Sequence, residues 1–374
     1  MPPTPDQTLT ITRIVVKLAS LGHEVTWAEP ITVGPLVTTY RFQPKAQSKV
    51  SAIVGLTQDL ALVLGVNDVM IQRLPGEHYI GVTVPNAERH VVLWRDTLGD
   101  ARSAGLTSPA PSVGLDSLSV PVNFGVDAEG RLFRDDLTRM PHLLIAGSTD
   151  SGKSTLLSSI IASIIYWRSP EDVELLLSDT KAVEFGAFTG APHLRCDPMT
   201  TTYQTLEKMD GLTKEIDARL ARLAKFGYQN IGQFKAAGLN NMPYIVLVID
   251  ELADFFPEDD RAQCRVSGAK LGRIVQKSRA TGIHVIAATQ RPSVNVVSGS
   301  IKANFPARLS FRLPSETDSR TVLGQGGAEH LLSRGDMLFL SPSRPALLRL
   351  HSALADQRDI RAAVEDATLR HAAR

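Results

Sequence analysis

Residues 147–154 match the pattern G-x-x-x-x-G-K-[ST] of loops that bind nucleotide phosphates. An apolar run, 142–146, comes directly before them and an amphipathic helix is expected directly after them, which is the context that the motif requires. Glycines let backbone N–H groups surround a phosphate, and the helix N-terminus adds partial positive charge. We expect Lys153 to span the β- and γ-phosphates of ATP and Ser154 to ligate Mg²⁺. A plain turn between strand and helix is the less favoured alternative. The predicted nucleotide-binding residues are Gly147, Ser148, Thr149, Asp150, Ser151, Gly152, Lys153, Ser154 and Thr155.

Polar residues also follow two other apolar runs. Asp250 and Glu251 come after the run 244–249, where an aspartate would order the Mg²⁺ shell and a glutamate would polarise an attacking water. Gln290 comes after the run 283–288 and is placed to hydrogen-bond that water. Solvated acids or a polar strand end would explain the same residues without chemistry, and for Gln290 the two interpretations are equally supported. With an intact phosphate loop upstream, the acidic pair predicts hydrolysis as well as binding.

Positive charge is concentrated after the acidic pair. Residues 261–315 contain ten Lys or Arg and no Asp or Glu, in a chain whose net charge is +1. Arg291, Lys302 and Arg308 flank a stretch, 292–299, that we interpret as a loop. A basic loop beside an ATP site is suited to contact a nucleic-acid backbone. Aromatic residues make up 6% of the chain and are not interleaved with these cations, which disfavours a single-strand binder.

The elements that must position these residues begin with a small α/β domain, expected at residues 1–100, that has no catalytic signature of its own. Its expected helices are 10–21, 49–64 and a short one at 90–94, and its expected strands are 37–42, 69–74 and 79–84. Residues 101–118 are rich in Gly, Ser, Ala and Pro and are interpreted as a linker.

Residues 119–374 are expected to form the second domain, which opens with a hairpin turning at 128–130. Its expected strands are 142–146, 173–177, 244–249 and 283–288, and its expected helices are 155–165, 209–224 and 265–281. Strands that are apolar throughout and alternate with helices predict a mainly parallel sheet covered on both faces, and hence an α/β fold. On the last of these helices, Lys270, Arg273 and Lys277 share a face that we expect to be solvated.

Composition is that of a globular protein with a substantial core: 43% of residues are hydrophobic and 21% are charged. Cys196 and Cys264 are far apart and indicate neither a disulfide framework nor a zinc site, and the histidines lack metal-ligand spacing. The N-terminus does not have the pattern of a secretory signal, and the apolar runs are far shorter than the ~20 residues of a membrane span. We therefore expect a cytoplasmic protein without a membrane segment.

Several stretches together resemble the FtsK/SpoIIIE double-stranded DNA translocases, of the HerA–FtsK branch of P-loop ATPases. The most specific are residues 140–147, 280–293, 301–304 and 318–329. The resemblance implies a RecA-like motor domain at 119–374, preceded by the small α/β domain and assembled as a homohexameric ring around duplex DNA. It implies ATP-driven translocation along that DNA. The chain is expected to be the motor portion alone, without the winged-helix DNA-reading domain, and the sequence indicates no recruiting protein.

The resemblance also implies roles for single residues. Arg279 matches the position of an arginine finger that enters a neighbouring subunit's site. Arg291, Lys302 and Arg320 match basic positions on DNA-facing loops, with surface ion pairs as the alternative.

Two residues depart from the family pattern. Asp150 stands where the family usually has Gly, and its charge would weaken polyphosphate binding unless the side chain points outward. Glu316 stands where relatives often have Lys, which would remove one phosphate contact per subunit. A conjugative coupling or DNA-packaging ATPase, and an FtsK-like protein-secretion ATPase, are the alternative functions. Tandem P-loop domains or membrane helices would favour the secretion ATPase.

Overall fold

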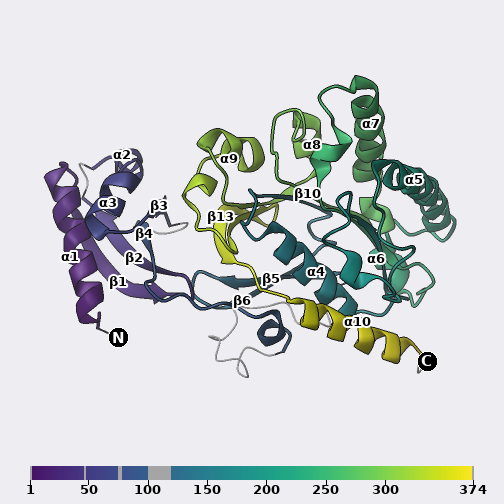
Figure 1. Ribbon diagram of the computed structural model, residues 1–374, viewed down its shortest axis with the longest axis horizontal. Coiled ribbons are helices and arrows are strands. Elements are labelled where there is room, and N and C mark those ends of the chain that lie inside the picture. The colour runs from purple at the N-terminus through teal and green to yellow at the C-terminus, as the bar shows by residue number, and fades with distance from the viewer. Residues whose placement is uncertain (1, 46–47, 75–77, 100–118, 373–374) are drawn as a thin grey trace.

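The computed structural model describes residues 2–45, 48–74, 78–99 and 119–372, which form two sheets (Figure 1). We call the described residues up to 91, with the smaller sheet, the N-terminal module, and the described residues from 92 onward the core module. The linker expected at 101–118 lies outside the described residues. The division into domains at residues 100 and 119 therefore stays a prediction.

The N-terminal module is a four-stranded antiparallel sheet with helices packed against it. Its strand order is β1-β2-β4-β3. The strands are β1 (Val25–Val33), β2 (Val37–Pro44), β3 (Met70–Arg73) and β4 (Ile80–Pro85), and the helices are α1 (Pro5–Ser20), α2 (Val50–Val54) and α3 (Thr57–Leu64). Apolar side chains from both helices and strands, including Ile14, Leu18, Phe42 and Leu60, fill a core of its own.

The core module has a nine-stranded sheet in the order β6-β5-β13-β12-β11-β7-β10-β9-β8. The five strands from β11 to β8 are parallel, and the other four extend the sheet in antiparallel pairing. The parallel strands are β7 (His142–Ala146), β8 (Val173–Ser178), β9 (Tyr244–Ile249), β10 (Ile283–Thr289) and β11 (Ala307–Phe311). The antiparallel strands are β5 (Pro121–Asp127), β6 (Leu132–Asp136), β12 (Asp336–Ser341) and β13 (Arg344–His351). The mainly parallel arrangement and the α/β class predicted from the sequence are confirmed.

Helices cover both faces of this sheet, as its apolar strands require. On β7, Leu143 and Ile145 face one hydrophobic cluster while Leu144 and Ala146 face the other. The first cluster includes side chains of α4 (Lys153–Trp167), α6 (Ile231–Ala236) and α10 (Gln357–Ala372). The second includes side chains of α5 (Thr202–Lys225), α7 (Arg261–Lys277), α8 (Gly299–Asn304) and α9 (Glu316–Leu323). In Figure 1, α10 lies below the sheet and α7, α8 and α9 lie above it.

The expected helix at 90–94 is wrong. Val92 and Trp94 are both buried in the core module, and the segment is extended because its backbone pairs with Leu354. The Leu354 N–H donates to Val92 O at 2.8 Å and the Trp94 N–H donates to Leu354 O at 2.8 Å. A single-turn helix, η1 (Trp94–Thr97), begins only at the last residue of this pairing. The chain thus joins the core module several residues before the expected linker.

Two other expectations for the N-terminal module were incomplete. The helix expected at 49–64 is two helices, because α2 ends at Gly55, a residue that weakens a helix interior. Strand β1 has no counterpart in the sequence prediction. It contains Pro30 and a register shift between Ala28 and Thr32, features that a strand tolerates when it lies at the edge of a sheet.

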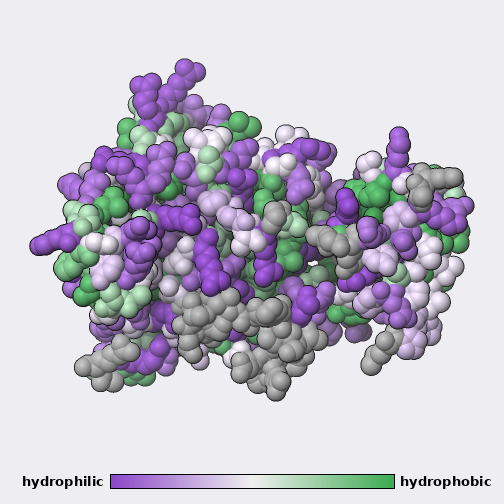
Figure 2. Space-filling view, turned by 180° about the vertical axis from the view of Figure 1, so that it is seen from behind, coloured by the Kyte–Doolittle hydropathy of each residue, from purple (hydrophilic) through white to green (hydrophobic). Residues whose placement is uncertain are grey.

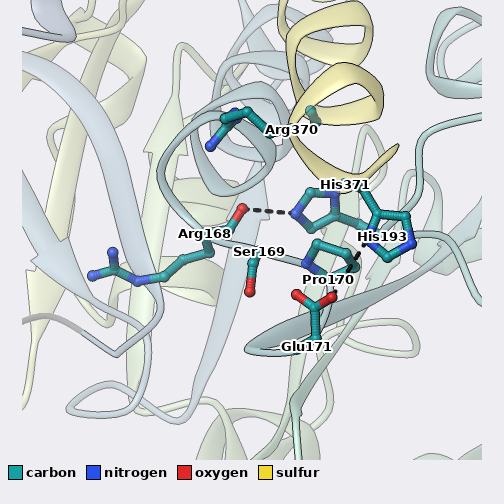
Figure 3. A pocket seen from close by; sticks show the side chains of 8 residues that line it. Arg168, Ser169, Pro170, Glu171, His193, Arg370 and His371 are labelled. Atoms are coloured by element: carbon teal, nitrogen blue, oxygen red, sulfur yellow. Dashed lines mark hydrogen bonds and ion pairs between the residues drawn. The ribbon is translucent and has the colours of Figure 1, made fainter. Parts of the chain in front are cut away.

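The C-terminal helix α10 is anchored at the end of α4 that lies away from the P-loop (Figure 3). His371 Nδ1 lies 3.4 Å from Glu171 Oε1, and His193 Nε2 lies 2.9 Å from Arg168 O. Burial lowers the pKa of His193, so its ring is neutral at pH 7 and donates that hydrogen bond. The hollow between these residues measures about 20 Å³. It has room for about one water molecule, so we assign it to helix packing.

Hydrophilic side chains dominate the face in Figure 2, and the hydrophobic ones visible there are scattered between them. Among the described residues, none of the helices has both the length and the apolar character to cross a bilayer.

Candidate nucleotide site

The P-loop joins β7 to α4 at the carboxyl edge of the parallel strands, where ligands of open α/β sheets bind. Helix α4 begins at Lys153 after Gly152, whose φ of 112° favours glycine. A Cβ on Gly152 would lie 2.8 Å from Gly335 N, and one on Gly147 would lie 2.8 Å from the Cβ of Phe311. Close packing therefore demands glycine at both positions. No side chain caps α4, so the amides of its first turn are available to an anion.

Lys153 and Asp250 are brought together from positions 97 residues apart in the chain. Lys153 Nζ donates to Asp250 Oδ1 at 2.6 Å and to Asp250 O at 2.7 Å. The two residues are 3% and 1% exposed, so this ion pair is buried. The ammonium is thereby held beside the phosphate loop by the aspartate at the end of β9. A bound polyphosphate would have to compete with Asp250 for Lys153.

Glu251 and Gln290 are also adjacent. The Glu251 carboxylate, 4% exposed, accepts hydrogen bonds from Thr289 Oγ1 at 2.7 Å and from Gln290 N at 3.1 and 3.2 Å. The Gln290 side chain reaches the P-loop, where Thr149 Oγ1 donates to Gln290 Oε1 at 3.3 Å. Three segments that the sequence connected only by motif therefore meet at one edge of the sheet. This arrangement is suited to hold and polarise a water beside a phosphate.

Sequence reasoning missed Glu184. Its carboxylate accepts a hydrogen bond from Ser154 Oγ at 2.7 Å, although it comes from the loop after β8. Asp179, the residue that follows β8, holds this loop, because its Oδ2 accepts from the N–H groups of Glu184 and Phe185. The available signal was an aspartate at the end of an apolar strand, as at Asp250, followed five residues later by a glutamate.

A cavity of about 840 Å³ surrounds the P-loop. Gly152, Lys153, Ser154, Glu184 and Gln290 are among the residues that line it. Other parts of its lining come from the N-terminal module and from the segments next to β12 and β13, namely Leu36, Arg89, His90, Val91, Ser333, Arg334, Gly335, His351, Ser352 and Leu354. Arg89 and His90 are exposed. No residue of the N-terminal module was predicted to lie at the site, so its contribution to the lining was not foreseen from the sequence.

The donor set at the P-loop suits Mg²⁺. Ser154 supplies a hydroxyl and Asp250 a carboxylate, and oxygen ligands are those that this ion prefers. Within the described ranges, His, Cys, Asp and Glu form no group of three or more suited to a metal. Mg²⁺ at nucleotide sites is usually held by one or two protein oxygens, with phosphates and waters completing its shell.

Asp150 is exposed and has φ of 60°, in the left-handed region where glycine is favoured. Asp adopts this conformation more readily than most residues. The backbone of the loop thus accounts for a preference for glycine at this position, independently of charge.

Arg279 lies at the opposite edge of the sheet from the P-loop. It precedes β10, whereas Gln290 follows that strand. The seven residues of β10 separate the two ends by roughly 23 Å at about 3.3 Å per residue. This separation prevents Arg279 from completing the site of its own chain. Its side chain is exposed and therefore accessible to another molecule.

The other predicted cations have different surroundings. Arg291 is exposed, directly beyond Gln290, and Lys302 is half-buried on α8. Arg308 donates to Lys302 O at 2.8 Å and to Phe305 O at 3.1 Å, so its guanidinium stabilises the end of α8. Arg320 on α9 is paired with Glu316 one turn earlier, at 2.6 Å between Nη2 and Oε1.

We expected the basic face of α7 to be solvated, but its cations form ion pairs with a neighbouring helix. Lys270 Nζ lies 2.6 Å from Asp210 Oδ2, and Arg273 Nη2 lies 3.0 Å from Asp217 Oδ2. Both acids are on α5, which packs beside α7. These cations therefore tie two helices together, in partly exposed ion pairs that each contribute up to about 1 kcal/mol.

Comparison with known proteins places these motifs in a family. The sequence model of the FtsK/SpoIIIE family matches residues 112–240 and 235–294, and that of the FtsK alpha domain matches residues 5–86. The DNA translocase FtsK of Pseudomonas syringae pv. syringae is 36% identical over 95% of this chain and 46% of its own length. That of Helicobacter pylori (strain J99) is 36% identical over 89% of this chain and 38% of its own length. The chain spans less than half the length of these relatives.

Solved structures share the fold. The pCW3 conjugation coupling protein TcpA, in its monomer form with ATPgS, matches with a TM-score of 0.65 and 20% identity, over 97% of this chain and 99% of that one. The cytoplasmic domain of the type VII secretion ATPase EccC from Thermomonospora curvata matches with a TM-score of 0.57 and 24% identity, over 68% of this chain and 33% of that one. These likenesses establish a P-loop ATPase fold.

Proposed function

This chain belongs to the FtsK/SpoIIIE family, and on that premise we propose that it is an ATP-driven motor that translocates double-stranded DNA. The observation that carries the proposal is the meeting of Lys153, Asp250 and Glu251 at the carboxyl edge of one sheet. The proposed setting of the motor is the cytoplasm, where ATP and duplex DNA are both available.

In this proposal the chain hydrolyses ATP at the P-loop. The amides of the loop and Lys153 would bind the phosphates, and Ser154 and Asp250 would hold Mg²⁺, which supplies charge neutralisation on the β- and γ-phosphates. Glu251 would polarise the attacking water, and Gln290, bonded to both Glu251 and the P-loop, would respond to the γ-phosphate.

We propose a homohexameric ring in which each site is completed by Arg279 of the neighbouring subunit. The position of Arg279, exposed and a strand length away from its own P-loop, supports a role between subunits. An arginine delivered in this way stabilises transition-state charge and couples one subunit's chemistry to its neighbour's state.

DNA would be contacted by cations of the segments that follow β10 and β11, which include α8 and α9. Arg291 and Lys302 are the principal candidates, and Arg320 is a weaker one because Glu316 offsets its charge. Contacts of this kind bind phosphates without regard to sequence, so they suit translocation along any duplex.

The decisive experiment is to measure ATP hydrolysis with and without linear duplex DNA over a series of salt concentrations. The expected result is stimulation by DNA that declines steeply with salt, together with ATP-dependent displacement of a third strand from a DNA triplex. An ATPase indifferent to duplex DNA at low salt would refute the proposal.

The alternative functions share the fold, as the matches to TcpA and EccC illustrate. The higher identity to the DNA translocases, 36% against 20% and 24%, favours translocation. A coupling ATPase that relies on partners for its DNA would give no displacement by the chain alone.

A further inference from the structure

Glu184 occupies a place in the nucleotide site that no motif assigned. Glu184 lines the P-loop cavity, and its carboxylate accepts a hydrogen bond from the Ser154 hydroxyl, with 2.7 Å between Ser154 Oγ and Glu184 Oε1. Ser154 is the residue expected to ligate Mg²⁺. The hydrogen bond to Glu184 therefore fixes the orientation of a side chain that is expected to ligate the metal.

The loop that carries Glu184 is fixed on both sides. Phe185 is fully buried and its ring packs edge-on against Phe188, whereas Val183 is 76% exposed. Asp179, itself buried, accepts the N–H groups of Glu184 and Phe185 at 2.8 and 2.9 Å. Ala182 has a left-handed φ of 55°. This conformation is unfavourable for a residue with a Cβ atom and persists only where its surroundings impose it. The well-packed, hydrogen-bonded loop thus holds the Glu184 side chain against Ser154.

A hydroxyl has one proton to donate and two lone pairs to offer. When the Ser154 hydroxyl donates its hydrogen bond to Glu184, the lone pairs of Oγ are left for other partners in the cavity. Groups outside the ligand shell commonly orient metal ligands in this way, and their loss weakens metal binding by about 10- to 100-fold.

We propose that Glu184 is a positioning residue for nucleotide-bound Mg²⁺, acting as the acceptor that turns the Ser154 hydroxyl oxygen toward the ion. Asp179 acts one step further back, by fixing the backbone that presents Glu184. This inference rests on the proposed function, because it assumes that the P-loop binds a magnesium nucleotide.

The proposal is tested by measuring nucleotide binding, without requiring ATP hydrolysis. A fluorescent, non-hydrolysable ATP analogue is titrated into the full chain over a series of Mg²⁺ concentrations and also in EDTA. For Glu184→Ala we expect a Mg²⁺ requirement raised by about 10- to 100-fold. Binding in EDTA should be unchanged or tighter, because a carboxylate that repels polyphosphate has been removed. Glu184→Gln should keep a Mg²⁺ requirement close to that of the wild type, since the amide oxygen can still accept the Ser154 proton.

Val183→Ala, on the exposed neighbour in the same loop, is the matched control and should bind as the wild type does. An unchanged Mg²⁺ requirement in Glu184→Ala would overturn the proposal, and so would an equal loss with and without Mg²⁺, which would indicate collapse of the loop. Equal losses in the Ala and Gln variants would assign the effect to charge and overturn it as well. A wild-type chain that binds no nucleotide would refute the proposed function instead.

Discussion

The side chain of Lys153 donates to both the carboxylate and the main-chain carbonyl of Asp250, at 2.6 and 2.7 Å, in a buried ion pair. A residue proposed to bind the phosphates and a residue proposed to hold Mg²⁺ therefore neutralise each other. Breaking a buried pair by removing one partner leaves an uncompensated charge, which costs more than the pair contributes.

The ion pair between Lys153 and Asp250 should matter for both nucleotide binding and stability. Lys153→Ala should abolish nucleotide binding and also lower the free energy of unfolding by about 3 kcal/mol or more, because Asp250 remains buried and charged. Adding Asp250→Asn should recover much of the stability without recovering binding. Urea unfolding and nucleotide titration of the four proteins in the cycle check this, and a Lys153→Ala variant as stable as the wild type would contradict it.

Glu251 should be needed for turnover and not for binding. Glu251→Gln keeps the shape of a side chain that Thr289 and Gln290 fix, but removes its capacity to take a proton from water. We expect ATP affinity within a few-fold of the wild type and hydrolysis reduced by about 10²- to 10⁴-fold. Glu258→Gln, on an exposed acid nearby, is the control and should hydrolyse ATP normally. Full turnover by Glu251→Gln would remove this residue from the mechanism.

Mixing variants tests whether Arg279 acts between subunits. Arg279→Ala and Lys153→Ala should each be inactive alone. Rings assembled from both should regain part of the DNA-dependent ATPase, because some sites receive an intact P-loop and an intact neighbouring arginine. A mixture of Lys153→Ala and Glu251→Gln should regain none, since both changes damage the same chain's half of the site. Activity that stays absent in the first mixture would refute the trans role.

Glu316 should lower the affinity for duplex DNA, because it pairs with Arg320 and offsets its charge. We expect Glu316→Gln to tighten duplex binding at low salt, and Glu316→Lys to tighten it further and steepen the dependence of log K on log salt by about 0.9 per added phosphate contact. The matched control is Asp366→Asn, which removes the same kind of pair with Arg370 on α10, across the sheet from α9. Unaltered DNA affinity in both Glu316 variants would place α9 away from the DNA.

Stability should fall in mild acid because of two buried histidines. Burial lowers the pKa of His142 to about 3 and that of His284 to about 4, from 6.5. The unfolded chain therefore binds more protons below pH 6.5, so the contribution of each group is complete above that pH and is lost as the pH falls toward the folded value. At pH 5 the loss is about 2 kcal/mol per histidine.

Urea unfolding at pH 7.5, 6 and 5 measures this slope. His284→Phe, beside the stacked ring of Tyr244, should flatten it while lowering stability at every pH, because the hydrogen bond to Pro141 O is lost. If the variant kept the full slope, His284 would not be one of the groups responsible.

The sequence was most informative where one pattern determines one structure. The buried strands β7, β9 and β10 were predicted to within a residue, because unbroken apolar runs bounded by polar residues have few other solutions. The P-loop was predictable because its glycines meet a requirement of the backbone, seen in the close approach of Gly152 to Gly335.

What escaped prediction depends on contacts between distant segments. The helical pattern at 90–94 yields to backbone pairing with Leu354, a residue more than 250 positions later. The place of Glu184 is set by Asp179 and by the path of the loop after β8, and the partners of the α7 cations lie on another helix. Local periodicity contains no information about such partners.

The backbone around Gly335 connects the phosphate loop to the N-terminal module. Its N–H donates to Ser151 O of the P-loop at 2.8 Å, and its carbonyl accepts from Ser352 N at 2.8 Å. The next residue, Asp336, forms a buried ion pair with Arg349, whose guanidinium also reaches the sulfur of Met70 in the N-terminal module. A continuous series of hydrogen bonds and one buried ion pair thus joins the phosphate loop to the N-terminal module.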